Sequence, residues 1–186
     1  MANKVHFGLS KIKLFPITKD DKDGTTYGEL IDLPGAVTLS LDSEENEGKF
    51  HADNMLYFSS FKSSGYTGSV EIARIPANVL TDIFGQTKDA TTGALVEKAD
   101  DQVKQFGMAF QIEGDESPTV YQLMKVSCGK PSVKSNTITD SAEPVTAELK
   151  ISATPRMSDQ AIKAIFEKEA TGYATALTKI MEKANA

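Results

Sequence analysis

The chain has 186 residues, 40% hydrophobic and 25% charged, with a formal net charge of −6. This is the balance of an ordinary globular protein, and the length fits one domain of moderate size with room for an appendage. Because phosphate binding requires clustered Lys and Arg, the acidic balance argues against tight nucleic-acid binding.

No apolar run approaches the 18 residues of a membrane-spanning helix, so we expect no membrane partner. The first residues also lack the apolar core of a secretory signal. The single cysteine, Cys128, has no second cysteine for an internal disulfide, as expected of a protein made in a reducing cytoplasm. We interpret it as a small buried hydrophobic residue on a strand rather than a reactive thiol.

The N-terminal residues predict a strand with a bulge. Apolar residues alternate over residues 5–14, but the phase shifts by one residue between Leu9 and Ile12, which is typical of a β-bulge. Pro16 is predicted to end this strand, and residues 20–24 have the composition of a turn.

Residues 31–42 predict one half-buried strand, because apolar side chains recur with a period of two at Ile31, Leu33, Val37, Leu39 and Leu41. Residues 43–54 are polar and acidic, and predict a long loop. A loop of this length is rarely kept in a compact domain without a function, so we expect it to contact another chain. The candidate contact residues are Asp42, Glu44, Glu45, Glu47, Phe50, Asp53 and Asn54.

Acidic residues are concentrated in this part of the chain. Residues 20–53 contain ten carboxylates against two lysines, a local charge of −8. Two interpretations remain open. An acidic surface next to DNA would keep the DNA from adhering, whereas an acidic surface facing water would simply favour solubility.

The middle of the chain predicts two further strands and one short helix. The strands cover residues 55–61 and 68–75, around a polar link at residues 62–65. Pro76 suits the first turn of a helix, an apolar stripe follows it, and Gly85 suits the exit. Residues 88–101 are rich in turn formers and are predicted to be irregular.

The following residues predict a hairpin and one more strand. Residues 106–112 and 119–128 are separated by a turn sequence and form the hairpin. A weaker strand is expected over residues 132–139 and a loop over 140–144. The last regular strand covers residues 145–153, before Pro155.

From Ser158 onward the apolar spacing changes to three and four residues, which predicts a helical tail. Gly172 weakens its middle by about 1 kcal/mol relative to Ala, so one helix or two are both compatible with the pattern. The apolar stripe of this tail suits either packing on its own domain or binding to a partner.

Together these elements predict a mainly β fold: a β-sandwich or barrel with one short flanking α-helix and a C-terminal helical extension. We place the β domain at residues 1–157 and the extension at residues 158–186.

The search for catalytic chemistry finds little, and we expect no enzyme, metal or cofactor. His6 and His51 lack a second ligand at metal-binding spacing, and the glycine-rich phosphate-binding motifs are absent. The pattern SxxK occurs three times without its companion motifs, and carboxylates near Glu44 and Glu116 lie in predicted loops. The aromatic run at residues 57–61, with Lys62, is the nearest approach to a nucleic-acid groove, but strand core is the favoured interpretation.

Six short segments, in the same order, resemble the major tail tube proteins of long, non-contractile phage tails, of the type found in phages of Gram-positive bacteria. The resemblance covers residues 4–157. Each segment is weak alone, and the six together are fairly specific: residues 4–10 (KVHFGLS), 34–42 (PGAVTLSLD), 50–54 (FHADN), 64–68 (SGYTG), 75–76 (IP) with the helix after it, and 151–156 (ISATPR).

The resemblance implies a β-sandwich subunit of a virion tail, assembled in the host cytoplasm. Six copies would close into a ring, and stacked rings would form a tube through which DNA passes without tight binding. Its partners would be further copies of itself and the tape-measure, tail terminator and tail-tip proteins. In this family a long loop between early strands reaches the neighbouring ring, which here would be residues 42–54. The helical tail departs from the family's typical ending.

A second hypothesis is a β-sandwich binding module for a cell-surface glycan or protein. Glycan sites usually expose Trp or Tyr beside polar groups, and this chain has no Trp.

Overall fold

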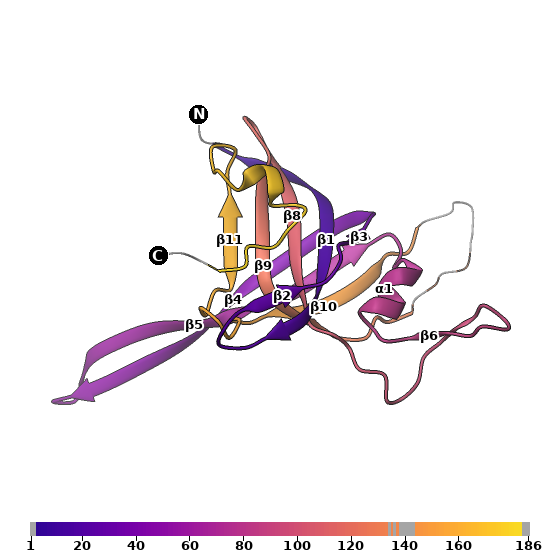
Figure 1. The fold of residues 1–186 in the computed structure, drawn as a ribbon. Coiled ribbons are helices and arrows are strands. Elements are labelled where there is room, and N and C mark those ends of the chain that lie inside the picture. Colours follow the sequence, from indigo (N-terminus) through magenta and orange to yellow (C-terminus); the bar gives the residue numbers. More distant parts are fainter. Residues whose placement is uncertain (1–2, 134, 136, 138–143, 184–186) are drawn as a thin grey trace.

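The computed structural model describes residues 3–133, 135, 137 and 144–183. One antiparallel sheet of nine strands makes up the body, in the order β2-β1-β8-β9-β10-β5-β4, with β3 beside β1 and β11 beside β9. In Figure 1, β1, β8 and β9 stand across β4, β5 and β10, so two parts of the same sheet face each other. The predicted mainly β fold with a short helix is confirmed. The strands of this sheet are β1 (His6–Asp20), β2 (Thr25–Tyr27), β3 (Ile31–Leu33), β4 (Ala36–Ala52), β5 (Met55–Ile72), β8 (Phe106–Gly114), β9 (Thr119–Cys128), β10 (Ala147–Ala153) and β11 (Lys163–Phe166).

The core lies between the two faces of this curled sheet. Both faces and the helix α1 (Ala77–Asp82) contribute to one cluster of buried side chains. Ile83 and Phe84, directly after α1, are fully buried, so the short helix is held by packing rather than by its own length. The cluster includes Ile12, Leu14, Leu33, Val70, Ile72, Val79, Phe106, Met108, Phe110, Leu123, Val126, Leu149 and Ile151.

Strand β1 confirms the predicted bulge and corrects its predicted end. Its register with β8 shifts between Phe7 and Leu9 and again between Ser10 and Lys13. The strand does not stop at Pro16 but runs to Asp20. Proline is tolerated because β1 changes partners there: the stretch before it pairs with β3, and residues 17–20 pair with β2.

The predicted strand over residues 31–42 is two strands, β3 and β4. Gly35 separates them with φ +81°, and a Cβ atom at this position would lie only 2.9 Å from the Ala73 Cβ. A register shift between Ala36 and Thr38 then turns the side chain of the intervening residue, Val37, to the other face of the sheet. As a result Val37 is 51% exposed, so its predicted place on the inner face is wrong.

The largest correction concerns residues 43–54, which do not form a loop. Strand β4 continues to Ala52, and β5 begins at Met55 and runs without interruption through residues 62–65. Only Asp53 and Asn54 connect the two strands, with φ +51° and +58°. Asp and Asn tolerate this left-handed region, so the pair forms the tight turn that a two-residue hairpin needs.

Other predicted elements are confirmed or extended. The hairpin of β8 and β9 is present, and β10 ends at Ala153 before Pro155. Residues 88–101 are predicted irregular, but in the structure they contribute to a small hairpin made by β6 (Thr87–Lys88) and β7 (Leu95–Val96). Residues 134, 136 and 138–143 lie outside the described part of the chain. The described residues of the predicted strand 132–139, which are 132, 133, 135 and 137, are not in a strand.

The C-terminal segment is not helical over its described residues, so that prediction is wrong. It contains β11 and one 3-10 turn, η1 (Tyr173–Thr175). The reason is a free sheet edge: β10 pairs with β9 only at residues 126–128, and β11 pairs with the remaining edge at residues 120–123. Backbone pairing with this edge outweighs the helical spacing of the side chains.

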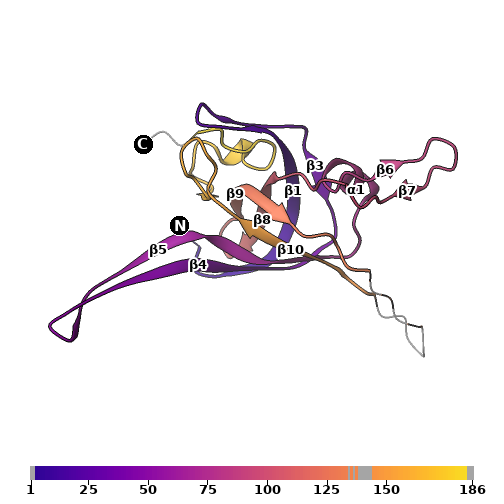
Figure 2. The ribbon, with the colours of Figure 1, turned by 90° about the horizontal axis from the view of Figure 1, so that it is seen from below.

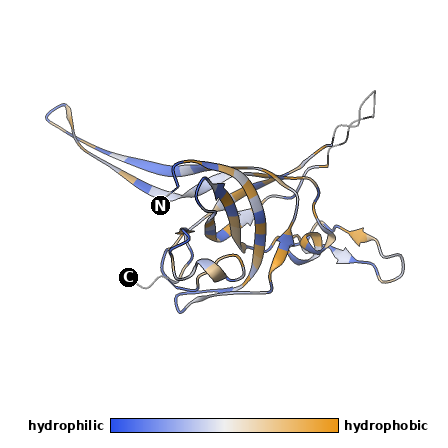
Figure 3. Ribbon diagram, turned by 90° about the horizontal axis from the view of Figure 1, so that it is seen from above, coloured by the Kyte–Doolittle hydropathy of each residue, from blue (hydrophilic) through white to orange (hydrophobic). Residues whose placement is uncertain are grey.

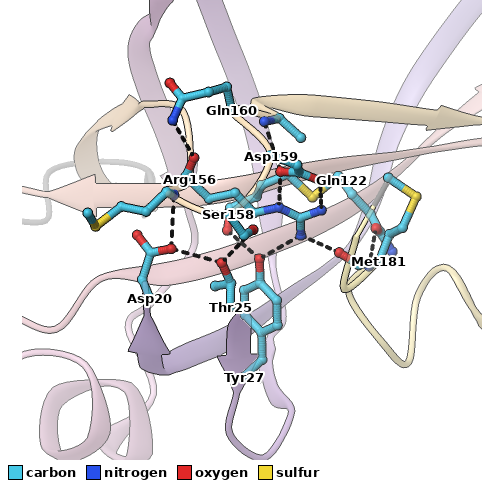
Figure 4. A network of polar contacts seen from close by, with 12 residues as sticks. Asp20, Thr25, Tyr27, Gln122, Arg156, Ser158, Asp159, Gln160 and Met181 are labelled. Atoms are coloured by element: carbon cyan, nitrogen blue, oxygen red, sulfur yellow. Dashed lines mark hydrogen bonds and ion pairs between the residues drawn. The ribbon is translucent and has the colours of Figure 1, made fainter. Parts of the chain in front are cut away.

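A buried polar network holds this segment to the body (Figure 4). The Arg156 side chain is fully buried, and its Nε and Nη2 donate to the two carboxylate oxygens of Asp159 at 2.7 and 2.6 Å. Its Nη1 donates to the backbone carbonyl of Met181 and to the Tyr27 hydroxyl. The Gln122 amide nitrogen donates to the Ala176 carbonyl at 2.6 Å, and its oxygen accepts from Met181 N–H at 3.0 Å.

Asp20 forms the second half of this network. Its carboxylate accepts from Lys125 at 2.7 Å, from Thr25 at 2.8 Å and from the Met157 N–H at 3.1 Å. Burial acts to raise the pKa of Asp20, but these three donors outweigh it and leave the pKa below its ordinary value. Residues on both sides of position 157 are thus tied to the same strands, and the predicted boundary at that position stays a prediction.

Gly68 occupies a crowded point in the sheet, which gives a first test of the fold. It pairs with Leu41 on one side and Ile151 on the other, and a Cβ atom there would overlap the Ser40 carbonyl oxygen. We expect Gly68→Ala to lower the free energy of unfolding by about 1–3 kcal/mol, measured by urea denaturation. Gly129→Ala is the matched control, since nothing lies within 4 Å of its Cβ position; equal stability of the two variants would contradict the packing.

Candidate assembly interface

The distal half of the β4–β5 hairpin projects from the body as an arm, which we define as residues 44–65 (Figures 1 and 2). Strand β10 pairs with β5 from Tyr66 to Ile72, so among the described residues the two strands of the arm pair only with each other. From Glu44 to the turn, about nine residues at 3.3 Å each give an arm of roughly 30 Å. Register shifts at both ends of the arm add twist to it.

The arm exposes an unusual number of large apolar side chains. Between residues 44 and 64 every residue except the half-buried Ala52 is exposed. Isolated two-stranded hairpins are at best marginally stable in water, and contiguous apolar patches on soluble proteins mark interaction sites. The exposed residues include Phe50 (59%), Met55 (62%), Leu56 (51%), Tyr57 (72%), Phe58 (59%) and Phe61 (67%).

Three of these aromatic residues gather near the tip. Phe50 lies opposite Phe58 in the register of the hairpin, and its ring meets the Tyr57 ring edge-on at a centroid distance of 6.3 Å. Figure 3 shows hydrophobic stretches at the far end of the arm and hydrophilic ones nearer the body. Among the described residues, the tip therefore offers an aromatic surface with no covering element of its own chain.

The charge of the arm is acidic. Four carboxylates (Glu44, Glu45, Glu47 and Asp53) stand against Lys49 and Lys62, a formal balance of −2. Lys49 pairs with Glu47 at 2.7 Å, and both side chains are exposed, so this pair contributes little to stability. The arm as a whole combines an apolar tip with an excess of negative charge.

The structure places every predicted contact residue except Asp42 on the arm. Asp42 lies at the foot of the arm, opposite Thr67, and Glu44, Glu45, Glu47 and Phe50 follow along β4. Asp53 and Asn54 form the turn at the tip. Their role in contact with another chain stays a prediction.

The aromatic residues of β5 lie in a different environment from the expected one. The sequence pattern favours strand core for Tyr57, Phe58 and Phe61, but all three are exposed, so that interpretation is wrong. A signal is present in the sequence: residues 55–58 are four consecutive apolar residues, which places apolar side chains on both faces of a strand. A strand with apolar side chains on both faces is buried only if other elements pack on both faces. The two-residue turn at Asp53 and Asn54 is too short to supply such an element.

One sheet edge is also open. The strand order ends at β4, whose outer edge pairs with no strand among the described residues. A long open edge is a template for pairing with another chain. The arm and this edge belong to the same strand, so they form one continuous surface for association.

The remaining candidate residues do not come together in a metal or catalytic site among the described residues. Within the described part of the chain, no group of three or more His, Cys, Asp and Glu side chains could hold a metal ion. His6 lies 6.5 Å from the Tyr121 ring, and His51 lies on the arm opposite Leu56. No helix of the described residues is long and apolar enough to cross a membrane. The expectation that the chain is not an enzyme stays a prediction.

Cys128 gives a test of its local environment. It lies on β9 opposite Ile151, and burial raises the pKa of its thiol to about 11. At pH 8 the thiolate fraction is then on the order of 0.1%, so we expect alkylation by iodoacetamide to be roughly 200-fold slower than for a free thiol of pKa about 8.5. Alkylation in urea is the control. A native rate equal to the rate in urea would contradict the burial.

Comparison with known proteins gives a distant structural likeness. No family model matches the chain, and no curated protein matches it. The fold is similar to a chain in the cryo-EM structure of the anti-feeding prophage baseplate, with a TM-score of 0.46 and 9% sequence identity, covering 91% of this chain and 99% of that chain. At this similarity nothing about function follows from the match.

Proposed function

We propose that this chain is a structural subunit of a phage-type tail, and specifically the major tail tube protein. In this proposal six copies close into a ring, rings stack into a tube, and the tube conducts DNA during ejection. The observation that carries the proposal is the arm: an exposed two-stranded projection with an apolar tip, which contact with another chain would stabilise. The six sequence segments that resemble tail tube proteins supply the specific family.

The proposed mechanism is mechanical and electrostatic. Open sheet edges pair between subunits, which removes them from solvent. Carboxylates that face the lumen repel the DNA backbone, so the DNA slides without adhering. Since charges are screened over about 8 Å at physiological ionic strength, only carboxylates near the DNA contribute.

Electron microscopy of the concentrated protein tests this proposal. Rings with sixfold symmetry, or tubes, are the expected result, with the tape-measure or initiator proteins of its own tail added if the chain needs nucleation. A chain that stays monomeric under all these conditions contradicts the proposal. The alternative of a glycan-binding module predicts instead a monomer that binds members of a glycan array.

A further inference from the structure

The end of the body next to α1 carries two shallow hollows, the first mainly apolar and the second lined by both apolar and polar side chains. The first, of about 390 Å³, lies between the β3–β4 corner and the start of the helix and is lined by Pro34, Gly35, Ala73, Arg74, Pro76 and Ala77. The second, of about 430 Å³, shares Ala73 and Arg74 with the first. Its lining includes the apolar Ile75, Leu80, Val133 and Val145 and the polar Gln86 and Glu97, whose carboxylate is already paired with Lys130 at 2.8 Å. The 97% exposed Val133 side chain adds apolar surface at its rim.

Arg74 lines both hollows. Its side chain is exposed, and within the described residues its guanidinium has no hydrogen-bond or ion-pair partner. An unpaired arginine amid apolar surface is a common anchor at protein interfaces. This end of the body therefore favours an apolar partner that carries a carboxylate.

The arm has this chemistry. Its tip carries Phe50, Tyr57 and Phe58 beside the exposed carboxylate of Asp53, which has no ion-pair partner in the described part of the chain. Each aromatic side chain buries about 150–250 Å² when enclosed. The aromatic residues of the arm thus bring several hundred Å², a large part of the roughly 800 Å² that one partner contributes to a standard interface.

The position of the arm relative to the hollows decides whether the same copy or a second copy can fill them. The arm extends away from the body on the side opposite α1 (Figures 1 and 2), so a chain cannot place its tip in its own hollows. A contact between two different surfaces is heterologous, and it repeats from copy to copy into a closed ring or an open filament.

We infer that the arm tip of one copy docks into the two hollows lined by Arg74 of a second copy. This inference rests on the proposed function and adds to it the receiving surface. Asp53 pairs with Arg74 of the next copy, and the aromatic residues of the tip pack against the apolar side chains of the two hollows that Arg74 lines. The partner is thus a second copy of this chain, joined head to tail.

Complementation between two defective variants tests the docking. The arm variant, Tyr57→Ser with Phe58→Ser, keeps its hollows. The hollow variant, Arg74→Glu with Ala77→Glu, keeps its arm, and both of its positions are exposed. We expect each variant alone to lose wild-type association by at least tenfold in sedimentation velocity, and a 1:1 mixture to form a heterodimer. Lys168→Glu, which makes the same charge reversal as Arg74→Glu at another exposed position, is the control and keeps wild-type association.

Site-directed cross-linking gives a second readout that also detects weak contacts. In a Cys128→Ala background, Met55→Cys on one copy and Ala77→Cys on another should form a disulfide-linked dimer only when mixed. A mixture without cross-links or heterodimers overturns the docking. If the hollow variant associates like the wild type while the arm variant does not, the arm docks elsewhere: the inference falls and the proposed function stands. If the arm variant also associates like the wild type, the arm is not the assembly element, and the observation that carries the proposed function falls with it.

Discussion

Shortening the arm should abolish association of this protein while leaving its body folded. The change replaces residues 46–62 with Asn-Gly, so that Glu45 and Ser63, which already pair in the register, are joined by a two-residue turn. Every deleted residue is exposed except the half-buried Ala52, and none belongs to the core cluster. We therefore expect the thermal midpoint to change by only a few degrees.

Association, in contrast, should weaken by more than about 100-fold, because buried aromatic anchors at interfaces each contribute about 2 kcal/mol or more. Circular dichroism measures the folding of the body, and sedimentation velocity with electron microscopy measures assembly. A full-length arm with Ser59→Thr and Ser60→Thr is the matched control and should assemble normally. Unfolding of the shortened chain would place the arm in the core, and unchanged assembly would place the interface elsewhere.

The body of the fold follows from local sequence patterns. The alternation in residues 106–112 and 119–128 predicts the central hairpin, and the phase shift after Leu9 predicts the bulge in β1. Proline and glycine correctly place the short helix. These elements pack on one common core, so the alternation of apolar and polar residues in each strand reports which of its side chains are buried.

The arm could not be predicted in the same way because nothing in the described part of the chain buries it. Its acidic half lacks apolar alternation and therefore resembles a loop, although Asp53 and Asn54 have the composition of a two-residue turn. Its apolar half resembles a core strand. Only the register between the halves, from Glu47 with Phe61 to Ala52 with Met55, shows that both are one projecting hairpin.

The C-terminal segment escapes prediction for a different reason. Its three- and four-residue spacing is a local property, whereas its structure is decided by the edge of β9 that β10 leaves unpaired. No short stretch of sequence shows that this edge is free, since residues 120–123 and 163–166 meet only in the folded chain. Arg156 is the residue whose burial fixes this arrangement.

Replacement of Arg156 by Met should be among the most destabilising single substitutions in the chain. The guanidinium is 0% exposed and bonded to Asp159, Tyr27 and the Met181 carbonyl. Its removal leaves the Asp159 carboxylate, only 9% exposed, without this cation. Breaking a buried ion pair in this way costs about 3–5 kcal/mol. Urea denaturation should show this loss, and hydrogen exchange should show faster opening of β11 than of β8.

The double variant Arg156→Met with Asp159→Asn separates charge from packing. The amide at position 159 carries no buried charge, yet its oxygen can still accept the Ala161 N–H that the Asp159 carboxylate binds at 3.1 Å. We therefore expect the double variant to regain about 1–2 kcal/mol of the lost stability. Lys179→Met is the matched control in the same segment, because Lys179 and Glu182 form an exposed ion pair that contributes little to stability. If Arg156→Met were as stable as this control, the buried network would not be what holds the C-terminal segment against β9.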